Sequence, residues 1–194
     1  MRVLFKNKIY LINFIAMTVL WTVSSFNYFL ISFQMKYIEG NIFLNTATST
    51  LSEVIAYLLS GLILKKFDVK KSFVSACMLS VGGSLLIIFI KPEDVSQIAY
   101  AFFVLTTKFG ISGTFNMVYI ATANYFPPAI LGSIFGYTNL IAKGFTFFAP
   151  EIAEAPVPWP MVTFGSACLL AAISTLFLTE HKKIAERGSF KSKS

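Results

Sequence analysis

Long apolar runs follow one another along this sequence with only short polar breaks, a pattern that a water-soluble core does not require. Of the 194 residues, 56% are hydrophobic, and the mean hydropathy is +0.71. At about 1.5 Å per residue, each run is long enough to cross a hydrocarbon core of about 30 Å. We therefore predict an all-α membrane protein whose six transmembrane helices cover residues 9–33, 43–64, 73–90, 98–126, 130–149 and 161–178.

A cleavable secretory signal is the competing interpretation of the first run, because a basic segment precedes it. The run is too long for such a signal and lacks a small-residue cleavage site, so we expect it to remain as a membrane span. The chain then divides into a basic cytosolic lead (residues 1–8), a transmembrane domain (residues 9–181) and a basic cytosolic tail (residues 182–194). The composition of the tail predicts disorder.

The basic residues separate cleanly when the loops are assigned alternately to the two sides of a membrane. The side that we predict to be cytosolic, together with both termini, holds Arg2, Lys6, Lys8, Lys65, Lys66, Lys70, Lys71, Lys182, Lys183, Arg187, Lys191 and Lys193. The opposite loops hold only Lys36 and Lys91. The net charge of +7 therefore reflects topology, and no nucleic-acid partner is expected, since the charges are not interleaved with stacking aromatic residues.

Three ionisable residues lie inside the apolar runs, namely Glu53, Lys108 and Lys143. A charge at that depth costs roughly 2.5 to 3.5 kcal/mol, so it is rarely kept without a use. Glu53 and Lys108 either neutralise each other as an internal ion pair or contact a substrate. Lys143 is then the unpaired charge: in a cavity it favours a carboxylate, sulfate or phosphate group, whereas a lysine that snorkels outward says nothing about substrate.

Polar residues form a stripe at three- and four-residue spacing along four of the predicted spans. The four stripes are Asn13, Met17, Trp21, Ser24, Tyr28 and Ser32; Thr46, Ser49, Glu53, Tyr57 and Ser60; Lys108, Ser112, Asn116 and Tyr119; and Gly132, Gly136, Asn139, Lys143 and Thr146. Simple helix packing is the alternative explanation for each stripe. If instead the stripes line one cavity, the candidate substrate-binding residues are Trp21, Tyr28, Glu53, Lys108, Asn116, Asn139 and Lys143.

Catalysis and cofactor binding find no support in the sequence. It has no nucleophile with a nearby base, no cluster of metal ligands and no glycine-rich phosphate loop, so we predict no enzyme, no cofactor and no metal site. Cys77 and Cys168 fall within spans and are interpreted as small apolar fillers. His181 falls at the predicted cytosolic end of the last span and is interpreted as an interfacial residue.

Several short motifs occur in a characteristic order. They are Leu4-Phe5-Lys6, Leu20-Trp21 through Tyr28, Gly40 to Asn45, Glu53 to Gly61, Lys108 to Ser112, Phe115-Asn116 with Tyr119, Tyr125-Phe126-Pro127, Ala149-Pro150 and Leu178 to Lys182. In this order the chain resembles the carboxy-terminal six helices of the organic cation and anion transporters of the major facilitator superfamily. The resemblance covers nearly the whole chain and implies half of a major facilitator fold.

The resemblance implies alternating access in a lipid bilayer, most commonly the plasma membrane. A small organic ion would be carried by two six-helix halves, so this chain would need an amino-terminal half or a second copy of itself. In the family, the position that matches Lys143 tends to be basic in carriers of anions, which favours organic anions here. The cytosolic gate loop is represented by Gly61, Lys65, Lys66 and Lys70, but Lys65 and Asp68 replace the family's Asp and second Gly.

A second hypothesis comes from another functional class. The chain would be a non-transporting membrane protein, truncated or regulatory, that associates with another carrier through its cavity face. Stable expression without any flux of substrate would distinguish this hypothesis from transport.

Overall fold

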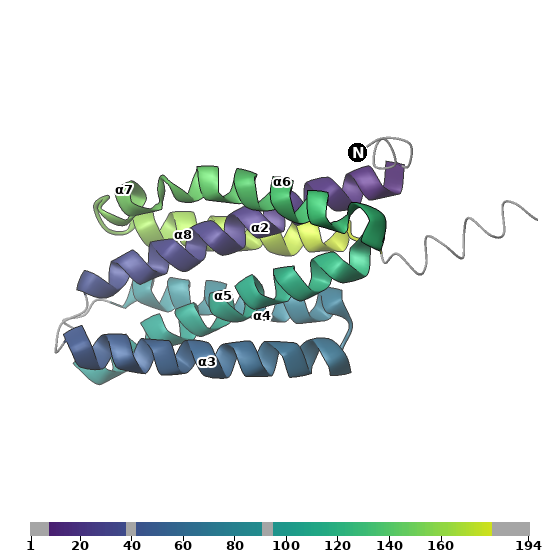
Figure 1. The fold of residues 1–194 in the computed structure, drawn as a ribbon. Helices are drawn as coiled ribbons and strands as arrows, with labels where there is room; N and C mark the ends of the chain where they lie inside the picture. Colours follow the sequence, from purple (N-terminus) through teal and green to yellow (C-terminus); the bar gives the residue numbers. More distant parts are fainter. Residues whose placement is uncertain (1–7, 38–41, 91–94, 180–194) are drawn as a thin grey trace, which may run out of the picture.

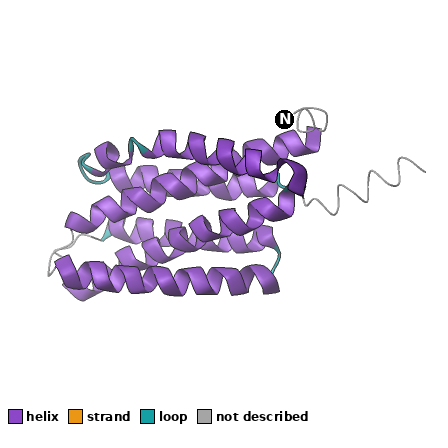
Figure 2. Ribbon diagram, viewed as in Figure 1, coloured by secondary structure: helices purple, strands orange, loops and turns teal. Residues whose placement is uncertain are grey.

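The structure, a computed structural model, describes residues 8–37, 42–90 and 95–179 (Figure 1). These parts contain helices joined by short loops and no strand, as Figure 2 shows, which confirms the all-α class. The long helices are α2 (Lys8–Gln34), α3 (Ile42–Lys66), α4 (Val69–Phe89), α5 (Gln97–Tyr125), α6 (Pro128–Thr146) and α8 (Trp159–Leu176). Two short helices, η1 (Met35–Tyr37) and α7 (Ala149–Ala153), follow α2 and α6. The predicted tail and most of the predicted lead lie outside the described residues.

Local signals set the helix ends. The side chain of Asp68 caps α4 by accepting a hydrogen bond from the Lys70 N–H at 3.4 Å, and Ser96 caps α5. α4 therefore begins four residues before the approximate start of the third predicted span at residue 73, because the cap starts the helix in the polar residues before the apolar run. The fifth predicted span runs to about residue 149, whereas α6 ends at Thr146 and α7 is a separate helix.

Among helices that follow one another in the chain, only α4 and α5 are main neighbours in space within the described residues. α5 packs extensively against α4, α3 and α2, whereas α6 packs mainly against α2, and α4 and α8 pack against each other. By contrast, α3 touches α4 only slightly, and α5 touches α6 only slightly. Four helices therefore lie in a row, in the order α3, α5, α2 and α6. These four helices carry the polar stripes.

Length and composition make the chain an integral membrane protein. Five of the described helices are long and apolar enough to cross a membrane: α2, residues 46–66 of α3, α4, α5 and α8. The 19-residue α6 is not among them, since its polar stripe lowers its hydropathy. Large apolar side chains on α3, such as Leu58 and Leu62, are at least 60% exposed. Surface of this kind suits lipid or another membrane helix.

The contact between α4 and α5 is made close by glycine. A Cβ atom added at Gly110 would lie 2.7 Å from the carbonyl oxygen of Ala76, and one added at Gly83 would lie 2.9 Å from the amide nitrogen of Thr107. A residue with a side chain does not fit at either position unless the helices shift, because backbone atoms as well as the hydroxyls of Ser80 and Thr107 lie within 3.0 Å of the added Cβ. The two glycines thus allow α4 to pack closely against α5, on the side of α5 that faces away from α2.

Candidate functional site

The predicted ion pair between Glu53 and Lys108 is confirmed. The ammonium nitrogen Nζ of Lys108, on α5, lies 2.6 Å from Oε1 of Glu53, on α3. The hydroxyl of Tyr28, on α2, donates a hydrogen bond to the other carboxylate oxygen, Oε2, at 2.9 Å. The side chains of Glu53 and Lys108 are only 14% and 7% exposed. Three spans thus meet at one charged cluster, in which each charge at depth has the partner that its burial requires.

Aromatic rings continue from this charged cluster along α2, α5 and α6. We call Trp21, Tyr28, Phe115, Tyr119 and Phe135 the aromatic cluster. Tyr28 stacks on Phe115 with ring centroids 5.2 Å apart, and Phe115 meets Tyr119 edge-on at 5.5 Å. Tyr119 also meets Trp21, at 4.4 Å, and stacks on Phe135 at 6.3 Å. Because aromatic faces attract cations, such a wall can hold a quaternary or protonated amine.

Two predicted substrate contacts have partners within the protein. The indole N–H of Trp21 donates to the hydroxyl of Thr122 at 3.0 Å, and only 1% of Trp21 is exposed. The side-chain amide of Asn116 donates to the carbonyl oxygen of Tyr57 at 3.1 Å and to the hydroxyl of Ser60 at 2.8 Å. Trp21 is therefore a buried member of the aromatic cluster that cannot be reached from outside. Asn116 joins α5 to α3.

Lys143 lies apart from the Glu53–Lys108 pair. It is exposed, and its Nζ lies 4.7 Å from the ring centroid of Phe29, which in turn meets the Tyr28 ring edge-on at 5.4 Å. Within the described residues it forms no ion pair. Asn139 is half-buried one helical turn earlier on α6. Lys143 is thus a cation beside the aromatic cluster that remains open to an external anionic group.

Sequence reasoning had not singled out Phe29 or Phe135 as site residues. The chain has 21 phenylalanines spread through its spans, and an isolated phenylalanine in an apolar run carries no signal of its own. Phe29 directly follows Tyr28, and Phe135 precedes Asn139 by four residues, so each lies near a polar stripe. That proximity was the only available sign.

The residues of the predicted gate loop lie where α3 passes into α4. Gly61 is half-buried on α3, and Lys65 and Lys66 are exposed at its end. Lys70 differs from them, since its Nζ donates to the carbonyl oxygen of Leu176, the last residue of α8, at 2.8 Å. A cation at a helix C-terminus is favourable, so Lys70 anchors the start of α4 to the end of α8.

A second polar contact joins the other end of the molecule. Lys36 Nζ lies 2.8 Å from Oε1 of Glu154, and the Gln34 amide donates to the carbonyl oxygen of Ala153 at 2.6 Å. The ammonium of Lys36 lowers the pKa of the exposed Glu154 carboxyl below its ordinary value. These contacts tie the end of α2 and η1 to the end of α7. Within the described residues, no group of three His, Cys, Asp or Glu side chains could hold a metal ion.

Comparison with known proteins decides the relationship. The chain is 32% identical over 165 residues to organic cation/carnitine transporter 2 of Homo sapiens and 30% identical over 164 residues to solute carrier family 22 member 4 of Mus musculus; each match covers 83% of the chain. An organic cation transporter-like protein of Drosophila melanogaster is 29% identical over 167 residues, or 84% of the chain. The chain is homologous to organic cation and carnitine transporters. No family model matches the sequence.

The chain spans only about 29% of the length of these three relatives. Its helices form half of a major facilitator transporter fold, in agreement with the fold predicted from the motifs. The relatives are transporters and not enzymes, which agrees with the expectation that the chain is no enzyme. The names of two of these relatives refer to organic cations, and one of the two also refers to carnitine, whereas Lys143 led us to predict anions.

Proposed function

We propose that the chain is the carboxy-terminal half of a membrane carrier for small organic ions and works by alternating access. Its relatives are carriers, and its charged cluster has the position that a carrier site requires. Glu53 lies near the middle of α3, and its partners Lys108 and Tyr28 reach it from two other spans. The observation that carries the proposal is this junction of three spans, together with Lys143, which forms no ion pair within the described residues and reaches the junction through Phe29 and Tyr28.

The charge of the substrate follows from which groups remain unpaired. Glu53 neutralises Lys108, while Lys143 has no such partner among the described residues. An anionic group on the substrate would form an ion pair with Lys143. The aromatic cluster beside it would bind a cationic group through its ring faces. Carnitine, which appears in the name of the human relative, carries both a carboxylate and a quaternary ammonium. We propose substrates with an anionic group, zwitterions included, and assign its recognition to Lys143.

The proposed partner is an amino-terminal six-helix half or a second copy of the chain. Both would face the row formed by α3, α5, α2 and α6, so the substrate would lie between the two halves. The charged cluster ties α2, α3 and α5 together, and these helices would therefore move as one body when the site opens to either side. Asn139, one turn from Lys143, would line the same space.

We also propose the plasma membrane as the location, with both termini in the cytosol. The start of α2, the connection from α3 to α4 and the end of α8 all lie at one end of the molecule, as Figure 1 shows, and this end carries the excess of lysine. Epitope tags placed before residue 8 and after residue 179 should be detected by antibody only after the plasma membrane is permeabilised. Detection of either tag in intact cells would contradict this orientation.

Charge-selective uptake tests the proposed substrate class. The chain would replace the matching segment of human organic cation/carnitine transporter 2, and cells with the chimera would be offered an organic anion, an organic cation and carnitine. Lys143→Asp should reduce uptake of the anion and of carnitine at least tenfold and spare the cation. The control Lys8→Asp makes the same charge change at the exposed start of α2 and should alter none of the three.

Unchanged selectivity in the Lys143→Asp chimera would contradict the role assigned to this lysine. A chimera that reaches the cell surface and transports none of the three probes would instead favour the alternative function, a non-transporting protein that associates with another carrier. Surface biotinylation separates that outcome from a failure of the chimera to leave the endoplasmic reticulum.

A further inference from the structure

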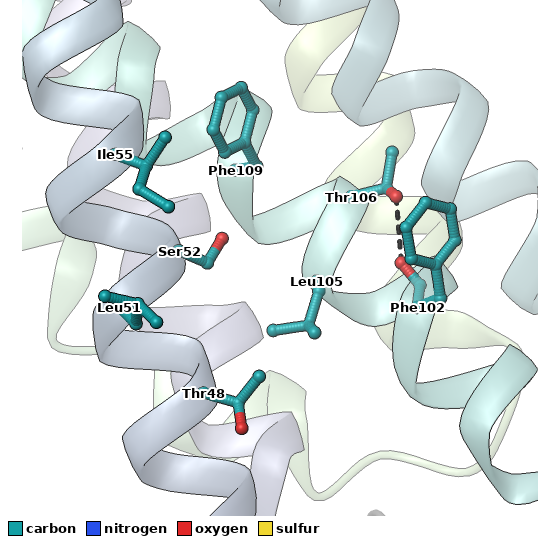
Figure 3. A pocket seen from close by; sticks show the side chains of 8 residues that line it. All are labelled: Thr48, Leu51, Ser52, Ile55, Phe102, Leu105, Thr106 and Phe109. Atoms are coloured by element: carbon teal, nitrogen blue, oxygen red, sulfur yellow. Dashed lines mark hydrogen bonds between the residues drawn. The ribbon is translucent and has the colours of Figure 1, made fainter.

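Two hollows lie on the side of the α3–α5 contact that faces away from Tyr28. The first, of about 370 Å³, lies between the first halves of α3 and α5, and Figure 3 shows its side chains, among them Leu51, Ile55, Leu105 and Phe109. The second, of about 230 Å³, is lined by α3, α4 and α5. The two hollows adjoin at Phe109, which lines both, and we call them together the outer groove.

The outer groove is apolar and owes its depth to small residues. Ala56, Ser60, Ala76, Gly110 and Gly113 line its second part, where three helices meet. The hydroxyl of Ser60 is already bonded to Asn116, and that of Thr106 donates to the Phe102 carbonyl, as drawn in Figure 3. The groove therefore offers little to a polar solute, and in a membrane its natural occupant is hydrocarbon.

The length of the outer groove suits a chain-like occupant. From Thr48 to Ile63 it follows α3 for roughly 22 Å, at about 1.5 Å per residue, which is most of a hydrocarbon core of about 30 Å. No residue of α2 or α6 lines it, so it is separate from the site that contains Lys143.

Two lysines lie at the end of the outer groove where α3 passes into α4. Lys66 follows the lining residue Ile63 by three positions on α3, and Lys71 precedes the lining residue Ser75 by four positions on α4. This spacing puts each lysine on the same face of its helix as the groove. Lys71 is exposed, and so is Lys66, whose Nζ lies 5.9 Å from the Phe67 ring centroid. An anionic headgroup would be bound between them.

We propose that the outer groove binds one anionic phospholipid, with an acyl chain between α3 and α5 and the headgroup at Lys66 and Lys71. The predicted orientation places these lysines at the cytoplasmic leaflet, which contains the anionic lipids of a cell membrane. Lys65 does not belong to this site, since one residue along a helix turns the side chain about 100° away from Lys66.

Native mass spectrometry of the purified full chain tests the proposal, with phosphatidylserine and phosphatidylcholine of identical acyl chains as probes. The wild-type chain should retain one phosphatidylserine in preference to phosphatidylcholine by roughly 25-fold, about fivefold for each lysine. Lys66→Gln combined with Lys71→Gln should abolish the preference and leave retention of phosphatidylcholine unchanged. Both lysines are exposed, so this double variant should fold.

Two further variants distinguish a specific lipid site in the outer groove from non-specific attraction of anionic lipid to basic residues. Lys8→Gln combined with Lys65→Gln removes the same charge at the same end of the molecule and should preserve the preference. Ser75→Phe, at an exposed position of the groove, should reduce retention of both lipids. Equal retention of the two lipids by the wild type, loss of the preference in the control pair, or no effect of Ser75→Phe would each overturn the proposal.

Discussion

Lys108 and Glu53 form an ion pair of 2.6 Å between two membrane-spanning helices, and Tyr28 of a third helix bonds to the same carboxylate. This arrangement explains how the chain keeps two charges inside apolar segments. Of the three ionisable residues inside the apolar runs, Lys143 is then the one without an oppositely charged partner in the described parts of the chain. We propose that the pair is structural, and we assign substrate recognition to Lys143.

The Glu53–Lys108 pair should show strong coupling in a double-mutant cycle. Glu53→Gln alone leaves the ammonium of Lys108 buried without a counter-charge and should lower the free energy of unfolding by about 3 to 5 kcal/mol. Glu53→Gln combined with Lys108→Met should recover much of that loss. Unfolding in mixed detergent micelles with increasing sodium dodecyl sulfate would measure both effects, and purely additive losses would argue against the pair.

Asn116 should affect stability more than substrate affinity. Asn116→Leu removes two hydrogen bonds from α5 to α3 and leaves the hydroxyl of Ser60 with fewer partners, so we expect a loss of about 1 to 3 kcal/mol in unfolding free energy. In the chimera used for uptake, KM for carnitine should stay within twofold of the unsubstituted value. A large rise in KM without a loss of stability would instead make Asn116 a substrate contact, as the sequence first suggested.

The adjacent glycines Gly82 and Gly83 provide a matched pair for the α4–α5 contact. Gly83→Ala brings its Cβ too close to Thr107 and should destabilise the protein by about 1 to 3 kcal/mol. Gly82→Ala meets nothing within 4 Å and should stabilise the helix by about 0.4 to 1 kcal/mol. Thermal unfolding of the two variants would compare them directly. Equal effects would mean that α4 and α5 are not as close as described.

Glu154 provides a test by pH. Lys36 lowers the pKa of this carboxyl in the folded protein, so the contact adds stability above the ordinary carboxyl pKa and loses it as the pH falls through the lowered value. Lys36→Met should return the pKa of Glu154 toward its ordinary value of 4.5. Carbon NMR of the labelled carboxyl would follow the titration. Lys70→Met, at the opposite end of the molecule, should leave it unchanged.

Much of the fold could be predicted from the sequence because each span corresponds to one continuous stretch of it. That stretch is an apolar run bounded by polar residues, proline or a cap. The predicted spans and the helices differ in their bounds where the apolar run is shorter or longer than the helix. The start of α4 depends on the cap at Asp68, and the end of α6 depends on the short α7, neither of which changes the apolar pattern. Burial of apolar surface predicts the spans, while hydrogen bonds at their ends determine where they stop.

The site was less predictable because its contacts join helices that are distant in sequence. Charge balance alone suggested the pairing of Glu53 with Lys108, since two opposite charges at depth stabilise each other. Nothing in the sequence showed that Trp21 would bond to Thr122 or that Asn116 would bond to Ser60. A polar stripe indicates that a helix face is buried, but the identity of each partner depends on the tertiary packing.

Substrate counterflow tests the central proposal most directly. Vesicles that contain the chimera with the human amino-terminal segments would be loaded with unlabelled carnitine and diluted into a trace of labelled carnitine. If the chain forms half of an alternating-access carrier, labelled carnitine should accumulate transiently above its equilibrium level inside the vesicles. Correctly inserted protein that produces no such overshoot, while vesicles with the unaltered human transporter do, would contradict the account.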